Sequence, residues 1–314
     1  MYSVIIPVYN AATFVERAVD SALQHPEVGE VLLVEDGSED TSLTICEKLS
    51  KKDERVILLR HPDGQNRGAG ASRNRGIGEA TQPYLSFLDA DDYYLANRFE
   101  KETKIWKKDK GIDGVYGALG INFQDAEGEN AWQQRREKNN QKDITTLAKV
   151  VNPDELFEYL IRFEGQSEGH LHLNTLTVKL SALKKQKLLF NEDLRLHQDA
   201  DFFWRLAYYL KLVPGEIKAP IAIRGVHKGN RFINNPDEYK SLLLQYESII
   251  DWATSNQIER KYFIHFKLKL HTAILHSHGK MKHFNSVRNI LLDPDRVAII
   301  LHLMHILVNK NIRK

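Results

Sequence analysis

The stretch SVIIPVYNAATFVERAVDSALQH, residues 3–25, joins an apolar, β-branched run to a segment in which apolar residues recur at helical spacing. The run SVIIPVY (3–9) predicts a strand. The segment AATFVERAVDSALQH (11–25) predicts a helix with one apolar face. A second apolar run, EVLLVED (30–36), predicts another strand, so the chain begins with a strand, a helix and a strand.

The same alternation continues to about residue 90. The further predicted elements are a helix through about 51, a strand at 56–61, a helix around 70–80 after a Gly-rich turn, and a strand at 84–90. These strands are almost continuously apolar, which indicates burial on both faces and therefore a parallel sheet flanked by helices, the α/β class. Crossovers between parallel strands are right-handed, so the C-terminal ends of the strands lie at one edge of the sheet, where ligands bind.

The pattern is less regular beyond Tyr94. The predicted elements there are a helix to about 110, a strand at 115–123, a helix at 153–163 and a strand at 173–180. Residues 124–149 are polar, charged and aperiodic, and we expect a long mobile excursion or lid there. From 235 onward the pattern is helical, with Asn235-Pro236 as cap and first position and with Gly279 and Pro294 as breaks.

Composition narrows the class of protein. The chain has 314 residues, of which 42% are hydrophobic and 27% charged, as in ordinary soluble globular proteins. A net charge of +2 argues against a dedicated nucleic-acid binder, although the segment from Gln257 to the end carries 11 Lys and Arg against 3 Asp and Glu. The lone Cys46 rules out an internal disulfide framework, and the N-terminus lacks the layout of a secretory signal, so we expect a cytoplasmic protein.

Three carboxylates, Asp89, Asp91 and Asp92, follow the predicted strand at 84–90. Such carboxylates repel one another unless a cation lies among them, and oxygen ligands suit Mg²⁺ or Mn²⁺. A turn that caps the following helix is the competing interpretation. A calcium loop fails, because the positions of Asp89, Asp91 and Glu100 match but tyrosines fill the fifth and sixth positions, and the sixth needs glycine.

Four segments, in this order and spacing, resemble the family-2 glycosyltransferases: PVYN (7–10), VEDGSEDTS (34–42), GASRNRGIGEA (70–80) and FLDADD (87–92). The resemblance covers roughly 1–230. It implies the GT-A fold, with a Rossmann-like, mostly parallel sheet, and an inverting, metal-assisted transfer of a sugar from a nucleotide sugar to a hydroxyl acceptor. It also implies a GT-A domain over 1–232, divided into a nucleotide-binding half (1–92) and an acceptor half (93–232), with a C-terminal helical region at 233–314.

The resemblance assigns roles on the nucleotide side. Pro7, Val8 and Tyr9 are expected to floor the nucleotide pocket, although a buried strand end would explain Val8 equally well. Asp36 is expected to accept a hydrogen bond from the imide N–H of a uracil-like base, with Glu35 beside it. The competing interpretation is that Asp36 belongs only to an Asp-Gly-Ser turn.

The resemblance also distributes the charged residues around the diphosphate. Arg73 is expected to approach the nucleotide or its phosphates, a contact that arginine makes well, and a solvated helix-face arginine is the alternative. Asp89 is expected to bind the ribose or the metal and Asp91 to bind the metal directly. Asp92 is expected to support these residues or to cap a helix.

The segment LLFNEDLRLHQDADFFWRLAYY (188–209) resembles the family segment in which a Glu-Asp pair supplies the general base. In this chain the pair is Gln198-Asp199, so a glutamine stands at the glutamate position. We assign Asp199 as the general base, with Asp201 as the alternative, and a helix-capping role for Asp199 as the competing interpretation.

The segment IRGVHKGNR (223–231) resembles a family element whose histidine reaches the metal or the diphosphate. In this chain that residue is His227, with Arg224, Lys228 and Arg231 available for phosphate charge; a structural histidine is the alternative. His302 and His305, at helical spacing, are interpreted as surface or packing residues.

The end of the chain leaves its own alternatives open. The run VAIILHLMHILV (297–308) is too short to span a bilayer and predicts a packed helical hairpin. The basic residues around it leave attachment to an anionic membrane surface, where a lipid-linked acceptor would lie, or self-association.

The expected partners are a nucleotide sugar, with UDP favoured, and a saccharide or lipid-linked saccharide acceptor. A nucleotidyltransferase is the first competing function, but the Gly-rich loop with lysine that such enzymes carry is missing near residue 10. A non-catalytic nucleotide-sugar binding module is the second, suggested only by Gln198.

Overall fold

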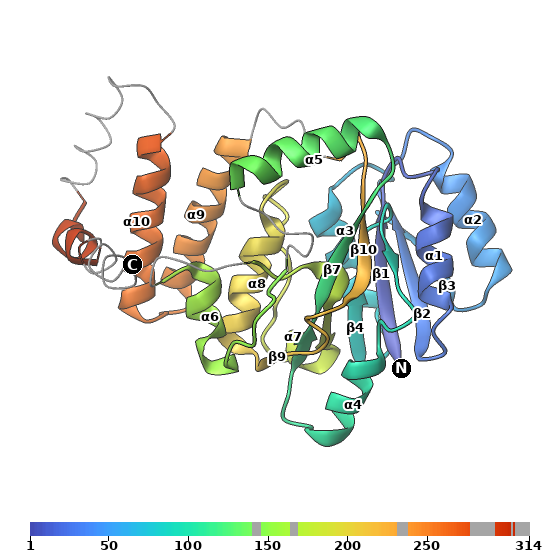
Figure 1. Cartoon of the computed structure of the whole chain (residues 1–314), viewed down its shortest axis with the longest axis horizontal. Coiled ribbons are helices and arrows are strands. Elements are labelled where there is room, and N and C mark those ends of the chain that lie inside the picture. Colours follow the sequence, from blue (N-terminus) through green and yellow to red (C-terminus); the bar gives the residue numbers. More distant parts are fainter. Residues whose placement is uncertain (140–145, 164–168, 231–237, 277–292, 303, 305–314) are drawn as a thin grey trace.

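The computed structural model of the chain describes residues 1–139, 146–163, 169–230, 238–276, 293–302 and 304 (Figure 1). A seven-stranded sheet in the order β3-β2-β1-β4-β8-β6-β9 forms its centre. The strands are β1 (Tyr2–Val8), β2 (Val28–Glu35), β3 (Val56–Arg60), β4 (Tyr84–Phe87), β6 (Gly114–Tyr116), β8 (Leu176–Lys179) and β9 (Leu212–Pro214). Only β8 runs antiparallel to its neighbours β4 and β6, so the prediction of a mostly parallel sheet is confirmed.

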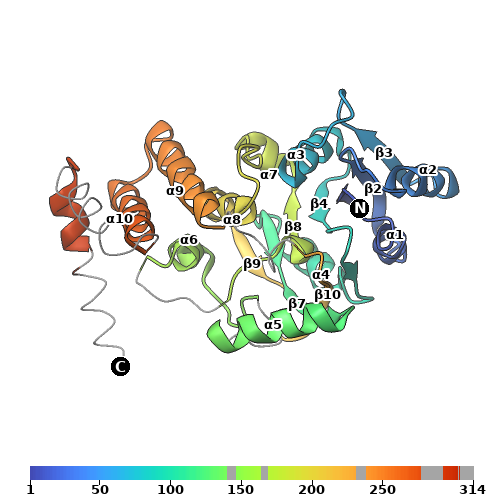
Figure 2. The same cartoon turned by 90° about the horizontal axis from the view of Figure 1, so that it is seen from above.

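Helices cover both faces of this sheet (Figure 2). The N-terminal ones are α1 (Val15–Leu23), α2 (Ser42–Lys52), α3 (Ala69–Glu79) and α4 (Glu100–Lys108). Successive side chains of a strand point to opposite faces, so Val4 and Ile6 pack with α1, α2 and α4, whereas Ile5 packs with α3. This burial on both sides is what the continuous apolar runs predicted.

A three-stranded sheet lies beside the large one. It consists of β5 (Tyr93–Tyr94), β7 (Ala118–Phe123) and β10 (Pro220–Val226) in the order β5-β10-β7. The single strand expected at 115–123 is therefore wrong: β6 belongs to the large sheet and β7 to the small one. The break is at Gly117, where a Cβ atom would lie 2.9 Å from the carbonyl oxygen of Glu216, so the backbones cross too closely for a side chain.

Two other predictions in this half need correction. The strand expected at 173–180 is a 3-10 turn (Leu173–Thr175) followed by β8, because His172 accepts a hydrogen bond from the backbone N–H of Asn174 and turns the chain. Residues 124–149 do not form an irregular excursion throughout, since α5 (Ala126–Asn139) is a helix that lies over β7 and β10 (Figure 1). Residues 140–145 lie outside the described part.

Helices α6 (Pro153–Ile161), α8 (Gln198–Tyr209), α9 (Glu238–Ser255) and α10 (Arg260–His276) lie toward the end of the molecule remote from β3 (Figure 1). Helix α7 (Leu180–Lys185) lies beside α3 (Figure 2). Ile249 of α9 and Phe266 of α10 share a hydrophobic cluster with Phe157 of α6 and Leu206 of α8. The C-terminal helical region is thus confirmed, and it is continuous with the core.

Several predictions fall outside the described residues: the Asn235-Pro236 cap, the break at Gly279, and the side chains of Arg231 and His305. The domain boundary at 232/233 falls there too and stays a prediction. Within the part that is described, no helix combines the length and the hydropathy that a membrane crossing demands.

Candidate active site

The carboxyl ends of three strands bring the predicted site residues to one edge of the large sheet. Val8, at the end of β1, pairs with Glu35, at the end of β2, and Ile5 pairs with Phe87, at the end of β4. Val8 is fully buried and is a core residue, Pro7 is partly buried, and the Tyr9 side chain is 46% exposed. Strand pairing alone therefore gathers segments that are some 80 residues apart in sequence.

Glu35 and Asp36 form a cluster of their own at this edge. The Asp36 carboxylate accepts hydrogen bonds from the backbone N–H groups of Arg67 (2.7 Å) and Gly68 (2.9 Å), and it lies 3.4 Å from His61 Nε2. Glu35 Oε1 accepts from the backbone N–H of Ser38 at 2.5 Å. Both carboxylates are buried, so they fix the turns after β2 and before α3.

We call the next group the Arg73 flank: Arg73, Asp89 and Asp199. The Arg73 guanidinium donates to Asp89 Oδ1 at 2.7 Å and to Asp199 Oδ1 at 3.4 Å, and only 4% of Arg73 is exposed. Burial opposes the charge, but Asp199 and Asp89 outweigh it, so the pKa of Arg73 is raised. Arg73 is thus no solvated helix-face residue; it is a buried cation that joins α3, the end of β4 and α8.

The Asp89 carboxylate is held ionised in this arrangement. Burial would raise its pKa, but the charge of Arg73 and the hydrogen bond from Arg73 prevail, so the pKa of Asp89 is lowered. The nearby His172 is buried, and desolvation together with the charge of Arg224 lowers its pKa well below the ordinary value.

We call the opposite group the Asp91 flank: Asp91, His227 and Asn230. His227 Nε2 lies 3.1 Å from Asp91 Oδ2, and Asn230 Nδ2 donates to the same oxygen at 3.0 Å. The backbone N–H of Gly229 donates to His227 Nδ1 at 3.1 Å, which leaves the proton on Nε2. In this arrangement His227 therefore donates a hydrogen bond to Asp91, and its expected role as a metal ligand, which stays a prediction, requires the proton to move to Nδ1.

Asp92 forms hydrogen bonds to residues that adjoin both flanks. It is 2% exposed and accepts hydrogen bonds from Asn174 Nδ2 and, at 2.8 Å, from the backbone N–H of Gly225. Asn174, fully buried, also accepts from the backbone N–H of Asp89 at 3.1 Å. Burial, followed by the charges of Asp91 and Asp89, raises the pKa of Asp92 well above its usual range. The expected supporting role of Asp92 agrees with these contacts, whereas they include no helix cap.

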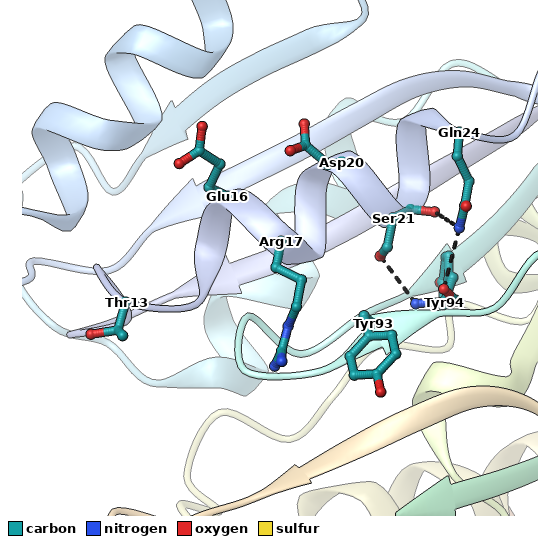
Figure 3. Close-up of a pocket in the computed structure, with 8 residues that line it drawn as sticks. All are labelled: Thr13, Glu16, Arg17, Asp20, Ser21, Gln24, Tyr93 and Tyr94. Carbon is teal, nitrogen blue, oxygen red and sulfur yellow. Dashed lines mark hydrogen bonds between the residues drawn. The ribbon is translucent and has the colours of Figure 1, made fainter. Parts of the chain in front are cut away.

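Sequence reasoning missed four residues that hold the site: Asn174, Asn230, Arg17 and Gln124. Arg17 of α1 donates to the backbone carbonyl of Asp91 at 2.9 Å, and Gln124 Nε2 reaches the same oxygen at 3.3 Å. Arg17 also lies against the ring of Tyr93, 4.6 Å from its centroid, in a groove along α1 (Figure 3). A signal existed for Asn174, since a polar amide stands between the leucines of LHLNTL, and none for the other three.

A divalent cation at this edge would have few ligands from the described side chains. Across the described ranges, no three or more His, Cys, Asp and Glu side chains are grouped so as to hold a metal ion. Asp91 fits as a single ligand, because its carboxylate is 31% exposed and its partners are a histidine and an asparagine rather than a cation. Asp89 fits less well, because one of its oxygens is bound by Arg73. A cation here would need further ligands from a bound diphosphate or from water.

Gln198 and Asp199, the pair expected to include the general base, differ in their exposure to solvent. Asp199, in the first turn of α8, is 43% exposed, so a substrate hydroxyl can reach it. Gln198 is 7% exposed, and its Oε1 atom lies against Gly70 of α3 without a hydrogen-bond partner among the described residues. Gly68, with φ +91°, thus serves the turn before α3, and Gly70 allows the close packing of α3 against Gln198. Asp201 is buried and paired with Arg205, which removes it from the reacting edge.

Comparisons with known proteins bear on the whole arrangement. The family model described as "Glycosyl transferase family 2" matches residues 3–163. The chain is 27% identical over 206 residues to the uncharacterized glycosyltransferase EpsJ of Bacillus subtilis, covering 64% of this chain and 54% of that protein. It is 29% identical over 202 residues to the succinoglycan biosynthesis protein ExoU of Rhizobium meliloti, covering 64% and 55%. The aligned part is thus about half the length of these relatives.

Solved structures resemble the fold at low identity. TarS of S. aureus, residues 1–349, in complex with UDP-GlcNAc, matches with a TM-score of 0.62 and 16% identity over 98% of this chain and 88% of that one. The mannosyltransferase PcManGT from Pyrobaculum calidifontis, in complex with GDP-Man and Mn²⁺, matches with a TM-score of 0.51 and 14% identity over 98% and 85%. The architecture is the expected GT-A fold. Since the family model covers more than half of the 314 residues, the chain belongs to glycosyl transferase family 2.

Proposed function

We propose that the chain is an inverting glycosyltransferase that moves a sugar from a nucleoside-diphosphate sugar, UDP-linked in our preferred version, to a hydroxyl of a saccharide or lipid-linked saccharide. The observation that carries the proposal is the Arg73 guanidinium, which contacts Asp89 at 2.7 Å and Asp199 at 3.4 Å. A carboxylate of α8 thereby lies next to the aspartates after β4, although the two segments are more than 100 residues apart in sequence.

The reaction assigns one step to each flank. Asp199, partly exposed beside Arg73, takes the proton of the acceptor hydroxyl. The acceptor oxygen then bonds to the anomeric carbon while the bond from that carbon to the phosphate oxygen breaks, so the nucleoside diphosphate leaves with the electron pair and the configuration inverts. Asp91 would hold Mg²⁺ or Mn²⁺, whose chemistry when bound is to neutralise charge on the diphosphate.

We propose the roles of the residues that face the nucleotide from where those residues lie at the sheet edge. Asp36 and Glu35 lie at the ends of the strands beside Tyr9, and we assign Asp36 to the base and Tyr9 to the wall of its pocket. UDP is preferred because the TarS structures carry UDP and UDP-GlcNAc, while PcManGT carries GDP-Man and Mn²⁺. A role in polysaccharide synthesis is suggested by the name of the succinoglycan biosynthesis relative.

The test is Asp199→Asn. The amide keeps the shape of the side chain but takes up no proton, so transfer should fall by about 10²–10⁴-fold, the usual range for a general base. The affinity of Asp199→Asn for UDP and Mn²⁺, measured by calorimetric titration, should equal that of the unmutated protein. Asp193→Asn replaces an exposed carboxylate of the preceding loop and should leave both the transfer rate and the affinity unchanged. Unchanged turnover in Asp199→Asn would remove the base, and turnover absent from the unmutated protein with every nucleotide sugar would favour a binding module.

Attachment to the inner face of a membrane is proposed for the C-terminal region. Val297, Ile300, Leu301 and Met304 are 43–64% exposed and recur at the spacing of one helix face, in a segment with 11 Lys and Arg against 3 Asp and Glu. Sedimentation with anionic vesicles should carry the protein down, and neutral vesicles should not. Equal sedimentation with both, or a dimer in light scattering that Leu301→Glu dissociates, would point to self-association instead.

A further inference from the structure

The corner between β7 and α5 lies directly against the Asp91 flank. The backbone N–H of Gln124 donates to the carbonyl of Val226 at 2.8 Å, and its side chain reaches the carbonyl of Asp91 at 3.3 Å. The corner therefore contacts the residue before His227 and the backbone of Asp91 at once. Sequence reasoning gave this segment no role beyond that of a lid.

Asp125 joins α5 to the turn formed by residues 227–230, which we call the His227 turn. One carboxylate oxygen accepts the backbone N–H of Gly128 at 2.6 Å, in the manner of a helix N-cap. The other oxygen accepts the backbone N–H of Lys228 at 3.1 Å. These two hydrogen bonds lower the pKa of Asp125. One side chain thus caps the helix and fixes the residue that follows His227.

Gly128 makes the second connection. A Cβ atom placed on Gly128 would lie 2.7 Å from His227 Cα and 2.9 Å from His227 N, closer than real Cβ atoms approach. The obstacle is backbone, which cannot rotate away as a long side chain would. The first turn of α5 therefore rests on the main chain of His227.

The described part of α5 buries two residues. Along Ala126–Gln134, where the side chains of α5 are described, the buried residues are Gly128 and Trp132, one helical turn apart. The His227 turn is fixed from the other side by Phe14, whose ring stacks on the imidazole at a centroid distance of 4.8 Å. A shift of the His227 turn therefore has to move the first turn of α5.

We propose that Asp125 and Gly128 are positioning residues that hold the His227 turn against Asp91, so that the position of α5 and the binding of a divalent cation at Asp91 are coupled. The inference rests on the proposed function only for the cation. Coupling of this kind is reciprocal: whatever displaces α5 weakens cation binding, and cation binding shifts α5. Asp91 receives two hydrogen bonds from this turn, from His227 and Asn230, which is the physical link.

The first experiment titrates Mn²⁺ into protein saturated with UDP, by calorimetry, for the unmutated chain, Gly128→Ala and Gly78→Ala. Gly78 is the matched control, because it also lies in a helix and a Cβ there meets nothing within 4 Å. We expect Gly128→Ala to lose about tenfold in Mn²⁺ affinity, the order typical of residues that orient a ligand. The UDP affinity of Gly128→Ala in EDTA should equal that of the unmutated chain. Gly78→Ala should match the unmutated chain in both its Mn²⁺ affinity and its UDP affinity.

The outcomes separate this inference from the proposed function. If Gly128→Ala folds and binds Mn²⁺ with the affinity of the unmutated chain, the inference is overturned but the proposed function is not. If Mn²⁺ does not change the UDP affinity of the unmutated chain, both the inference and the metal-assisted part of the proposed function are overturned. Equal losses with and without metal would show a general structural defect and also overturn the inference.

Asp125→Ser keeps the test decisive if Gly128→Ala does not fold. A single hydroxyl can cap α5 but cannot reach both N–H groups, so the melting temperature should stay close to that of the unmutated chain while Mn²⁺ affinity falls about threefold to tenfold. Trp132 supplies an independent signal, in a variant whose other three tryptophans are phenylalanine. Mn²⁺ with UDP should change Trp132 fluorescence, and Asp125→Ser should reduce that change. Fluorescence insensitive to Mn²⁺, or a full response in Asp125→Ser, overturns the coupling.

Discussion

The Arg73 flank and the Asp91 flank both present a carboxylate from the turn after β4, yet the protein treats the two carboxylates differently. On the Arg73 flank a buried guanidinium contacts Asp89 and Asp199, so the positive charge is built in. On the Asp91 flank the carboxylate meets an imidazole and a side-chain amide. The first arrangement supplies one positive charge to its two carboxylates within the fold, and the second leaves the charge of Asp91 for a ligand to neutralise.

This difference separates stability from function across a short stretch of sequence. A buried cation between two carboxylates ties α3 to α8, so its loss should cost folding free energy. Hydrogen bonds from His227 and Asn230 orient Asp91 without cancelling its charge, so their loss should affect ligand binding more than folding. Substitutions on the Arg73 flank should therefore act first on folding, and substitutions on the Asp91 flank should act first on ligand binding.

Asp91→Asn should have the largest effect. The amide keeps the volume but removes the charge that we assign to cation binding, and a Lewis-acid contribution of several kcal/mol corresponds to a loss of about 10²–10⁴-fold in kcat/KM. The stimulation of UDP binding by Mn²⁺, measured by calorimetry, should disappear as well. Asp109→Asn, an exposed carboxylate at the end of α4, is the control. A kcat/KM within threefold of the unmutated value would mean that the two flanks do not differ in the way proposed.

Arg73→Met should have the next largest effect, and on stability first. The substitution leaves two carboxylates facing each other without a cation; a fully buried pair would lose about 3–5 kcal/mol, and the partial exposure of Asp89 and Asp199 lowers the expectation to about 2 kcal/mol. Urea denaturation measures this change. Arg75→Met, on the same helix but 40% exposed, should change the free energy of unfolding by less than about 0.5 kcal/mol. Equal values for the two variants would contradict the assignment of Arg73.

The sequence predicted the first half of the fold more closely than the second because burial there repeats along the chain. Strands β1 to β4 are apolar on both faces, and their ends differ from the predicted ones by three residues at most. The helix α5 carries no such pattern, since Gly128 and Trp132 are the residues it buries within its described side chains. Its position depends on contact with the His227 turn, about 100 residues away, which no local periodicity records.

The candidate site, like the fold, could be predicted only where a local sequence pattern marks the residues. Asp89 and Asp91 were predicted from the carboxylate cluster after a buried strand, and Asp199 and His227 from the resemblance. The structure brings the four together in two pairs, joined by Arg73 in one case and by a direct contact in the other. What could not be predicted was the pairing itself. Whether Arg73 meets solvent, phosphate or carboxylate depends on the distance between α3 and α8, and that distance is set by packing around residues such as Gly70.

Gln198→Glu tests whether the Arg73 flank can accept one more carboxylate, and its effect depends on pH. At 7% exposure beside Asp199, a glutamate should have a pKa above the unfolded value of about 4.3. The folded chain then binds more protons than the unfolded chain between the two pKa values, so the free energy of unfolding falls as pH rises through that range.

We therefore expect Gln198→Glu to unfold about 1–2 kcal/mol more easily than the unmutated chain at pH 7, and to match it near pH 4. Urea titrations at both pH values measure this difference. Gln257→Glu, an exposed site that adds the same charge, is the control and should show little change at either pH. A Gln198→Glu variant as stable as this control at pH 7 would show that the flank has spare positive charge.

Asn230 provides the smallest and most discriminating test, because its two replacements should act in opposite directions. Its amide donates to Asp91 Oδ2 at 3.0 Å and accepts from the backbone N–H of His227 at 2.6 Å. Asn230→Ala removes a residue that orients Asp91, so Mn²⁺ affinity in the presence of UDP should fall about threefold to tenfold, with little change in stability because the side chain is partly exposed. Asn230→Asp places a second carboxylate beside Asp91, which repels it in EDTA and lowers the melting temperature, but adds a ligand once Mn²⁺ arrives. Mn²⁺ should then raise the melting temperature of Asn230→Asp more than that of the unmutated chain. If Mn²⁺ stabilised neither variant beyond what UDP does alone, Asp91 would be one more structural carboxylate, and the contrast between the two flanks would be one of geometry only.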